Sequence, residues 1–131
     1  MSPGFDLTLD QREHYLFARV DGPEDTYEVS VAYWTRLRAE CEARGTRRLL
    51  VLEALEGNAV PGEAREVVEA LVRMGFHDIR IAYVDATEDA ALLVSSEIRV
   101  VRAGVRARVF RGVEEAESWL LEASADPSGA A

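Results

Sequence analysis

The pattern of hydrophobic and polar residues predicts two short strands at the start of the chain. Phe5, Leu7 and Leu9 alternate with polar residues, which predicts a half-buried strand. A second strand is predicted for residues 14–20, which are rich in aromatic and β-branched side chains and end at the turn sequence 21–23. Because the link between the segments is short, we expect them to pair as an antiparallel hairpin.

The remaining chain alternates between helical spacing and short apolar runs. The first predicted helix begins at residues 24–25 and ends at Gly45. Its apolar stripe comprises Tyr27, Val31, Trp34, Leu37 and Cys41. A second helix is predicted to end near Gly75 and a third to run from a cap at Asp85 or Thr87 to about residue 103. Apolar residues from Val113 to Ala123 predict the last helix.

Three apolar runs between these helices, residues 48–54, 79–84 and 105–110, predict strands. The element order is therefore ββαβαβαβα. This order predicts an α/β fold with a five-stranded, mixed and largely parallel sheet, an N-terminal antiparallel hairpin and four helices. We expect one domain over residues 1–123 and a disordered tail over residues 124–131.

Three stretches carry a resemblance to a known fold family. They are residues 15–23 (YLFARVDGP), 79–85 (IRIAYVD) and 109–120 (VFRGVEEAESWL). With the element order, they resemble the STAS-like proteins, and more closely their SpoIIAA-like branch, which shares its architecture with CRAL-TRIO lipid-transfer domains. The resemblance implies a regulatory module with a phosphorylatable Ser or Thr after the central strand. The corresponding residues 54–66 contain neither, so no phosphorylation switch is expected there.

The charge of the chain narrows the range of partners. Its 131 residues carry a net charge of −9, and all 15 basic residues are arginine. An acidic chain lacks the basic surface that nucleic acid or an anionic membrane requires. No apolar run is long enough to span a membrane and no signal peptide precedes the first strand, so we expect a cytoplasmic protein without membrane insertion.

Polar and flexible residues cluster around the end of the predicted central strand, residues 48–54, and ligands of open α/β proteins favour the carboxyl ends of strands. The candidate interaction loop comprises Glu53, Glu56, Gly57, Asn58 and Glu63. Paired carboxyl groups can divide acid and base chemistry when one is desolvated, so an enzyme using Glu53 and Glu56 is one interpretation. A solvated acidic loop is the other.

A second candidate surface is basic. Arginines 99, 102, 106 and 108 lie close together in the sequence and form a candidate patch for an acidic partner. Arg106 and Arg108 are expected on one face of the last strand, opposite Val105, Ala107 and Val109. The alternative is a solvated strand edge, where charged side chains prevent pairing with other chains.

The remaining reactive side chains form no recognisable set, so we predict no catalytic residue, cofactor or metal site. His14 and His77 lack metal-ligand spacing. Cys41 lies on an apolar helix face, where packing is its expected role. Trp34 and Trp119 are expected in the core, or alternatively as the lining of a hydrophobic pocket.

Two hypotheses of function follow besides the enzyme. The first is a non-catalytic regulatory or protein-interaction module whose partner is another protein or a second copy of the chain in a homodimer. The second is a carrier or sensor of a small apolar or amphipathic ligand, which would need a closed pocket of a few hundred cubic ångströms.

Overall fold

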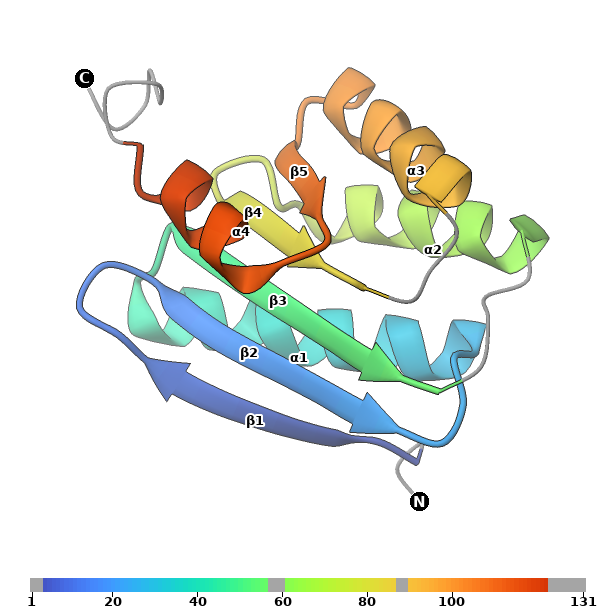
Figure 1. Cartoon of the computed structure of the whole chain (residues 1–131), viewed down its shortest axis with the longest axis horizontal. Helices are drawn as coiled ribbons and strands as arrows, with labels where there is room; N and C mark the ends of the chain where they lie inside the picture. Colours follow the sequence, from blue (N-terminus) through green and yellow to red (C-terminus); the bar gives the residue numbers. More distant parts are fainter. Residues whose placement is uncertain (1–3, 57–60, 87–89, 123–131) are drawn as a thin grey trace.

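A computed structural model describes residues 4–56, 61–86 and 90–122, and these residues form one α/β layer structure (Figure 1). The strands are β1 (Asp6–Gln11), β2 (Leu16–Gly22), β3 (Arg48–Leu55), β4 (Arg80–Val84) and β5 (Arg106–Phe110). The helices are α1 (Tyr27–Arg44), α2 (Pro61–Met74), α3 (Ala90–Arg102) and α4 (Val113–Leu120). This order confirms the predicted succession of elements.

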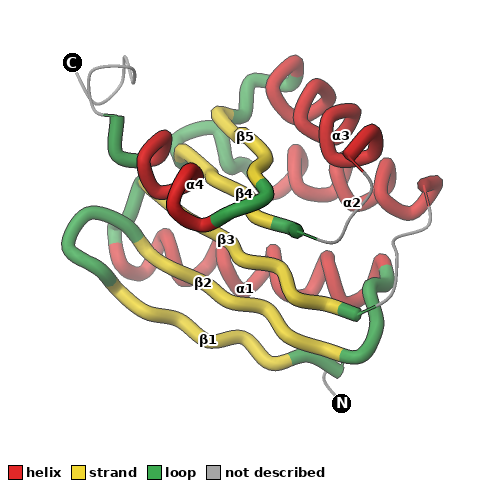
Figure 2. The backbone as a smooth tube through the Cα atoms, in the orientation of Figure 1, coloured by secondary structure: helices red, strands yellow, loops and turns green. Residues whose placement is uncertain are grey.

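The strands form a mixed sheet in the order β1-β2-β3-β4-β5. β1 pairs antiparallel with β2, whereas β2–β3, β3–β4 and β4–β5 are parallel pairs. The predicted hairpin and largely parallel sheet are therefore confirmed. Crossover connections between parallel strands are almost always right-handed, so successive crossovers in one direction place their helices on one face. Accordingly α1, α2 and α3 lie on one side and α4 on the other (Figure 2).

The core has two parts, one on each face of the sheet. The larger part lies between the sheet and α1–α3, and β3 contributes Leu49, Val51 and Leu55 to it. The smaller part lies under α4 and receives Leu50 from β3. Successive side chains of a strand point to opposite faces, so a strand buried on both sides needs apolar residues at every position. The apolar run predicted as the central strand does occupy the central position.

Helix α1 begins later than the sequence pattern suggested. Its first residue is Tyr27, and Thr26 is the N-cap, whose side chain accepts a hydrogen bond from the Val29 N–H at 3.2 Å. A threonine hydroxyl is a good N-cap acceptor, which explains why the acids at 24–25 precede the helix instead of starting it. The predicted end is confirmed: Gly45 adopts a left-handed conformation with φ 65°.

The buried face of α1 also differs slightly from the predicted stripe. Trp34, Leu37 and Cys41 are buried as expected, but Tyr27 and Val31 are only partly buried. Three residues take the inner positions of the first turns instead: Val29, Ser30 and Tyr33. The inward face is therefore rotated toward Ser30 and Tyr33, which brings a tyrosine hydroxyl over the sheet.

Three sequence-based expectations lie wholly or partly outside the described residues. They are the capping residues Thr87 and Glu88, the end of the last helix at Ala123, and the tail 124–131. In the part of the chain that the structure describes, none of the helices combines the length and apolar character needed to cross a membrane.

Candidate functional site

A cavity of about 120 Å³ lies between the sheet and the three helices on its larger side. The floor comes from β3, β4 and β5, and the walls come from α1, α2 and α3. Most of the lining is apolar, with Val68 and Leu71 from α2 and Val100 from α3. The cavity is only partly enclosed and reaches the surface.

One acidic side chain interrupts the apolar floor. Glu53 lies near the carboxyl end of β3. It alternates along the strand with Val51 and Leu55, so its side chain points into the larger part of the core as theirs do. Its exposed fraction is only 7%. A carboxyl group in this position loses most of its contact with water, so it needs hydrogen bonds from the protein.

Aromatic residues surround this carboxyl group. The Tyr33 hydroxyl donates a hydrogen bond to Glu53 Oε2, and Tyr83 also hydrogen-bonds the Glu53 side chain. Tyr83 is opposite Val51 in the β3–β4 register, which places it beside Glu53 on the same face. The Trp34 ring stacks against Tyr83, with ring centroids 6.2 Å apart. Aromatic rings therefore surround the Glu53 carboxyl group.

The surroundings favour the protonated form of Glu53. Burial raises the pKa of Glu53 from 4.5 to about 8, and the charges of Asp25 and Asp85 act in the same direction. Hydrogen bonds from Tyr33 and Tyr83 partly oppose this increase. Burial and the nearby Glu53 also raise the pKa of both tyrosines well above 10, so both hydroxyl groups stay protonated. At neutral pH this end of the cavity therefore holds a protonated carboxyl group and two hydroxyl groups.

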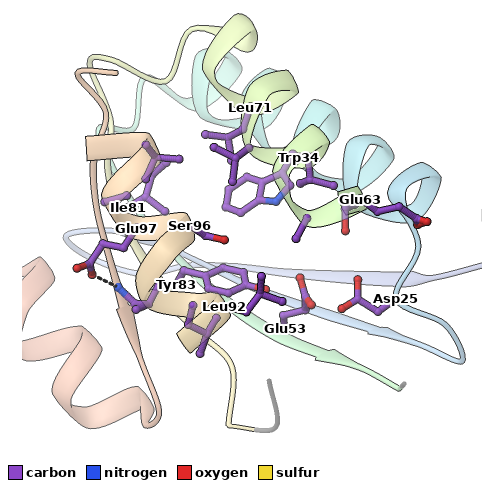
Figure 3. Close-up of a pocket in the computed structure, with 18 of the residues that line it drawn as sticks. Asp25, Trp34, Glu53, Glu63, Leu71, Ile81, Tyr83, Leu92, Ser96 and Glu97 are labelled. Atoms are coloured by element: carbon purple, nitrogen blue, oxygen red, sulfur yellow. Dashed lines mark hydrogen bonds between the residues drawn. The ribbon is translucent and has the colours of Figure 1, made fainter. Parts of the chain in front are cut away.

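Two further carboxyl groups lie at the same end of the cavity. Figure 3 shows Asp25 beside Glu53, with Glu63 on the same side, while Trp34 and Tyr83 border the open space. Glu63 lies in the first turn of α2, and its Oε1 accepts a hydrogen bond from the backbone N–H of Tyr27 at 3.3 Å. This bond links the starts of α1 and α2.

The structure brings together only some members of the candidate interaction loop. Glu53 and Glu63 both line the cavity, whereas Glu56 is exposed and lies outside the lining. Gly57 and Asn58 lie outside the described residues. The cavity therefore does not unite Glu53 with Glu56, the pair considered for acid and base chemistry.

The four arginines of the candidate basic patch lie on two elements. Arg99 and Arg102 are exposed in the last turn of α3. Arg106 and Arg108 lie on β5, and Ala107 between them and Val105 just before the strand face the larger part of the core, as the alternation predicted. The Arg108 guanidinium carbon is 5.5 Å from the centre of the Phe110 ring, which packs on the α4 side.

The two tryptophans have different surroundings. Trp34 is 5% exposed and lines the cavity, as the pocket alternative predicted. Trp119 lies on the opposite face of the sheet, where the Arg80 guanidinium carbon is 3.7 Å from the centre of its ring. Arg80 also donates a hydrogen bond to the Trp119 carbonyl at 2.7 Å. Trp119 therefore belongs to the packing of α4.

Histidine and cysteine take no part in this site. His77 is exposed and contacts the Ala103 carbonyl at 3.1 Å. Burial raises the pKa of the Cys41 thiol to about 11, so the thiol stays protonated and packs as an apolar group. Within residues 4–56, 61–86 and 90–122, no three His, Cys, Asp or Glu side chains gather in a way that could hold a metal ion.

The sequence pattern did not point to Asp25, Tyr33 or Tyr83 as members of the site. Asp25 and Tyr33 lie 20 or more residues from Glu53 in the sequence, and only the fold brings them together. The sequence does contain a sign of Glu53. In a strand that is buried on both faces, Glu53 alternates with Leu49, Val51 and Leu55 and therefore points to the same side of the sheet as they do. A carboxyl group at such a position points to a site because burying it without a partner is costly.

These features define an α/β protein with a surface-reaching cavity between its sheet and three helices, whose polar end lies near the carboxyl end of β3. A scan against protein-family models finds no match to this chain, and a search of curated proteins finds no similar sequence.

Proposed function

We propose that this chain is a binding module for a small amphipathic ligand, acting as its carrier or sensor. The observation that carries the proposal is the cavity of about 120 Å³, with apolar walls and a polar end at Glu53. Ligand sites usually combine an apolar lining with a few polar groups that orient the ligand. The volume is smaller than the few hundred cubic ångströms expected from sequence, which limits the enclosed part of the ligand to a small group.

The position of the polar end supports the same proposal. Glu53 lies near the carboxyl end of β3, and the apolar part of the cavity extends over β4 and β5 as far as Ile81 and Ala107. An apolar space with a polar group at one end suits an amphipathic ligand. The resemblance to STAS-like and lipid-transfer domains is compatible with a role in binding. The separation of Glu56 from the cavity removes the geometric basis for acid and base chemistry by Glu53 and Glu56.

The cavity is tested by filling it. Ala107 lines the floor on β5, and Ala107→Leu adds three carbon atoms to that space. Ala39→Leu is the matched control, since Ala39 is exposed on α1. Benzyl alcohol, benzylamine, benzoate and hexanol are titrated against each protein, with Trp34 fluorescence and protein NMR shifts as readouts.

We expect saturable binding of at least one compound by the unmodified protein and by Ala39→Leu, and loss of that binding in Ala107→Leu. NMR shifts should concentrate on residues that line the cavity. Failure of all four compounds to bind the unmodified protein, or binding that persists in a folded Ala107→Leu variant, would contradict the proposal.

A second candidate function is self-association through α3. Val94, Ile98 and Val101 are 50%, 45% and 50% exposed and share one face of this helix. Arg99 and Arg102 flank this stripe and can pair with acidic side chains of a second copy, which offsets part of the repulsion between two chains of net charge −9.

Light scattering after size exclusion should then show a concentration-dependent dimer at low salt. Ile98→Arg should remove the dimer, because it places a charge within the apolar stripe, and Arg36→Ala on the exposed part of α1 should retain it. A monomer at every concentration would refute this second candidate without affecting the first.

A further inference from the structure

The charge and size of the cavity point to one class of ligand. We propose that it binds a small primary amine, with the ammonium group among Asp25, Glu53 and Glu63 and the apolar group in the remaining space. This inference rests on the proposed ligand-binding function. A cavity of about 150 Å³ can enclose benzene. The volume of about 120 Å³ therefore limits the enclosed apolar group to about the size of a phenyl ring.

The sign of the charge at the cavity favours a cation over an anion. Asp25, Glu53 and Glu63 line one end, and the negative charges of Asp25 and Asp85 act on Glu53. Arg108 is the one basic residue among the described lining residues, and its guanidinium lies near the Phe110 ring on the α4 side. A carboxylate or phosphate ligand would therefore meet like charges at the polar end, and an ammonium group would meet opposite ones.

The aromatic lining also favours a positively charged ligand. Trp34, Tyr33 and Tyr83 line the cavity, and the faces of such rings attract ammonium groups. A bare metal ion fits less well, since the described carboxyl groups do not gather closely enough to coordinate one. An organic cation needs no such close set of oxygen ligands, because its N–H donors and apolar group reach several side chains at once.

Binding of an ammonium group should change the protonation of Glu53. The groups that act on Glu53 come from α1 and its preceding loop and from β4 and its end: Asp25, Tyr33, Tyr83 and Asp85. The other charged residues of the cavity lining come from α2, α3 and β5: Glu63, Glu97 and Arg108. An ammonium group beside Glu53 favours its ionised form. The Glu53 proton then passes to solvent, and the bound state contains an ammonium–carboxylate pair.

The experiment compares three ligands of nearly equal size and different charge: benzylamine, benzyl alcohol and benzoate. Their binding is measured by calorimetry from pH 6 to pH 8, in buffers of different ionisation enthalpy so that proton release is counted. The proteins are the full chain, Glu53→Gln and the control Glu56→Gln, which makes the same change at an exposed residue outside the cavity.

We expect benzylamine to bind most tightly, to release up to one proton, and to gain up to about tenfold in affinity for each pH unit. Glu53→Gln should remove the proton release and weaken the preference for benzylamine, because Asp25 and Glu63 remain, while Glu56→Gln should keep both. Equal or tighter binding of benzyl alcohol or benzoate, or amine binding without proton release, would overturn the amine inference and leave the cavity function intact. If none of these three ligands binds but hexanol does, the amine inference fails and the proposed function stands; if hexanol fails to bind as well, both are refuted.

Discussion

Replacing Glu53 by glutamine should remove a large part of the pH dependence of stability. The folded protein holds the Glu53 proton up to about pH 8, whereas the unfolded chain releases it near its ordinary pKa of 4.5. Between these values the folded state binds more protons than the unfolded state. The free energy of unfolding therefore falls as the pH rises from about 4.5 to about 8, and the contribution of Glu53 is constant outside this interval.

The size of the effect follows from the same two values. The interval from 4.5 to about 8, at about 1.4 kcal/mol for each pH unit, gives about 5 kcal/mol. Glutamine keeps the shape of the protonated side chain and an oxygen that accepts the Tyr33 hydrogen bond. Glu53→Gln should therefore match the unmodified protein at pH 4 and exceed its free energy of unfolding by about 5 kcal/mol at pH 9.

The assay is urea unfolding followed by circular dichroism at pH 4, 6, 8 and 9. Glu56→Gln is the control, because it removes the same charge from an exposed position and should give a curve nearly parallel to that of the unmodified protein. If the free energy of unfolding of Glu53→Gln changes with pH in the same way as that of the unmodified protein, Glu53 has the same pKa in the folded and unfolded states and the reasoning is wrong.

Three further predictions concern single residues. Cys41 should resist thiol reagents at pH 8 in the folded protein and react fully in urea, because burial raises its pKa to about 11; rapid labelling of the folded chain would contradict this. Gly22→Ala should lower the free energy of unfolding by about 1–3 kcal/mol in urea titrations, because the new Cβ would lie 2.9 Å from a backbone carbonyl oxygen. Tyr33→Phe should raise the pKa of Glu53 in carboxyl-carbon NMR, because it removes a hydrogen bond that lowers it, and an unchanged pKa would refute that role.

The fold could be predicted from sequence because its signals are local. Alternation predicted β1, aromatic and β-branched residues predicted β2, the continuous apolar run predicted β3, and Gly45 predicted the end of α1. The start of α1 was missed by two or three residues, since Asp25 and Thr26 are both plausible N-caps. Only the folded structure shows that the Thr26 side chain accepts the Val29 N–H.

The site was less predictable because it depends on contacts between distant segments. The sequence pointed to Glu53 and Glu63, and both line the cavity. It could not show that α1 places Tyr33 over Glu53, since this depends on the rotation of the helix about its axis by a fraction of a turn. Nor could it show that Glu56, only three residues from Glu53, lies outside the cavity.

The order of strands in the sheet has a consequence for how the chain folds. Each strand pairs with the strands that precede and follow it in the chain, so none is inserted between two neighbours already formed. The sheet can therefore grow by adding one strand and its helix at a time. Contacts between segments close in sequence require little loop closure, which favours fast folding. During synthesis, β1, β2 and β3 can pair before β5 has left the ribosome, and the cavity closes only when β5 and α3 are added.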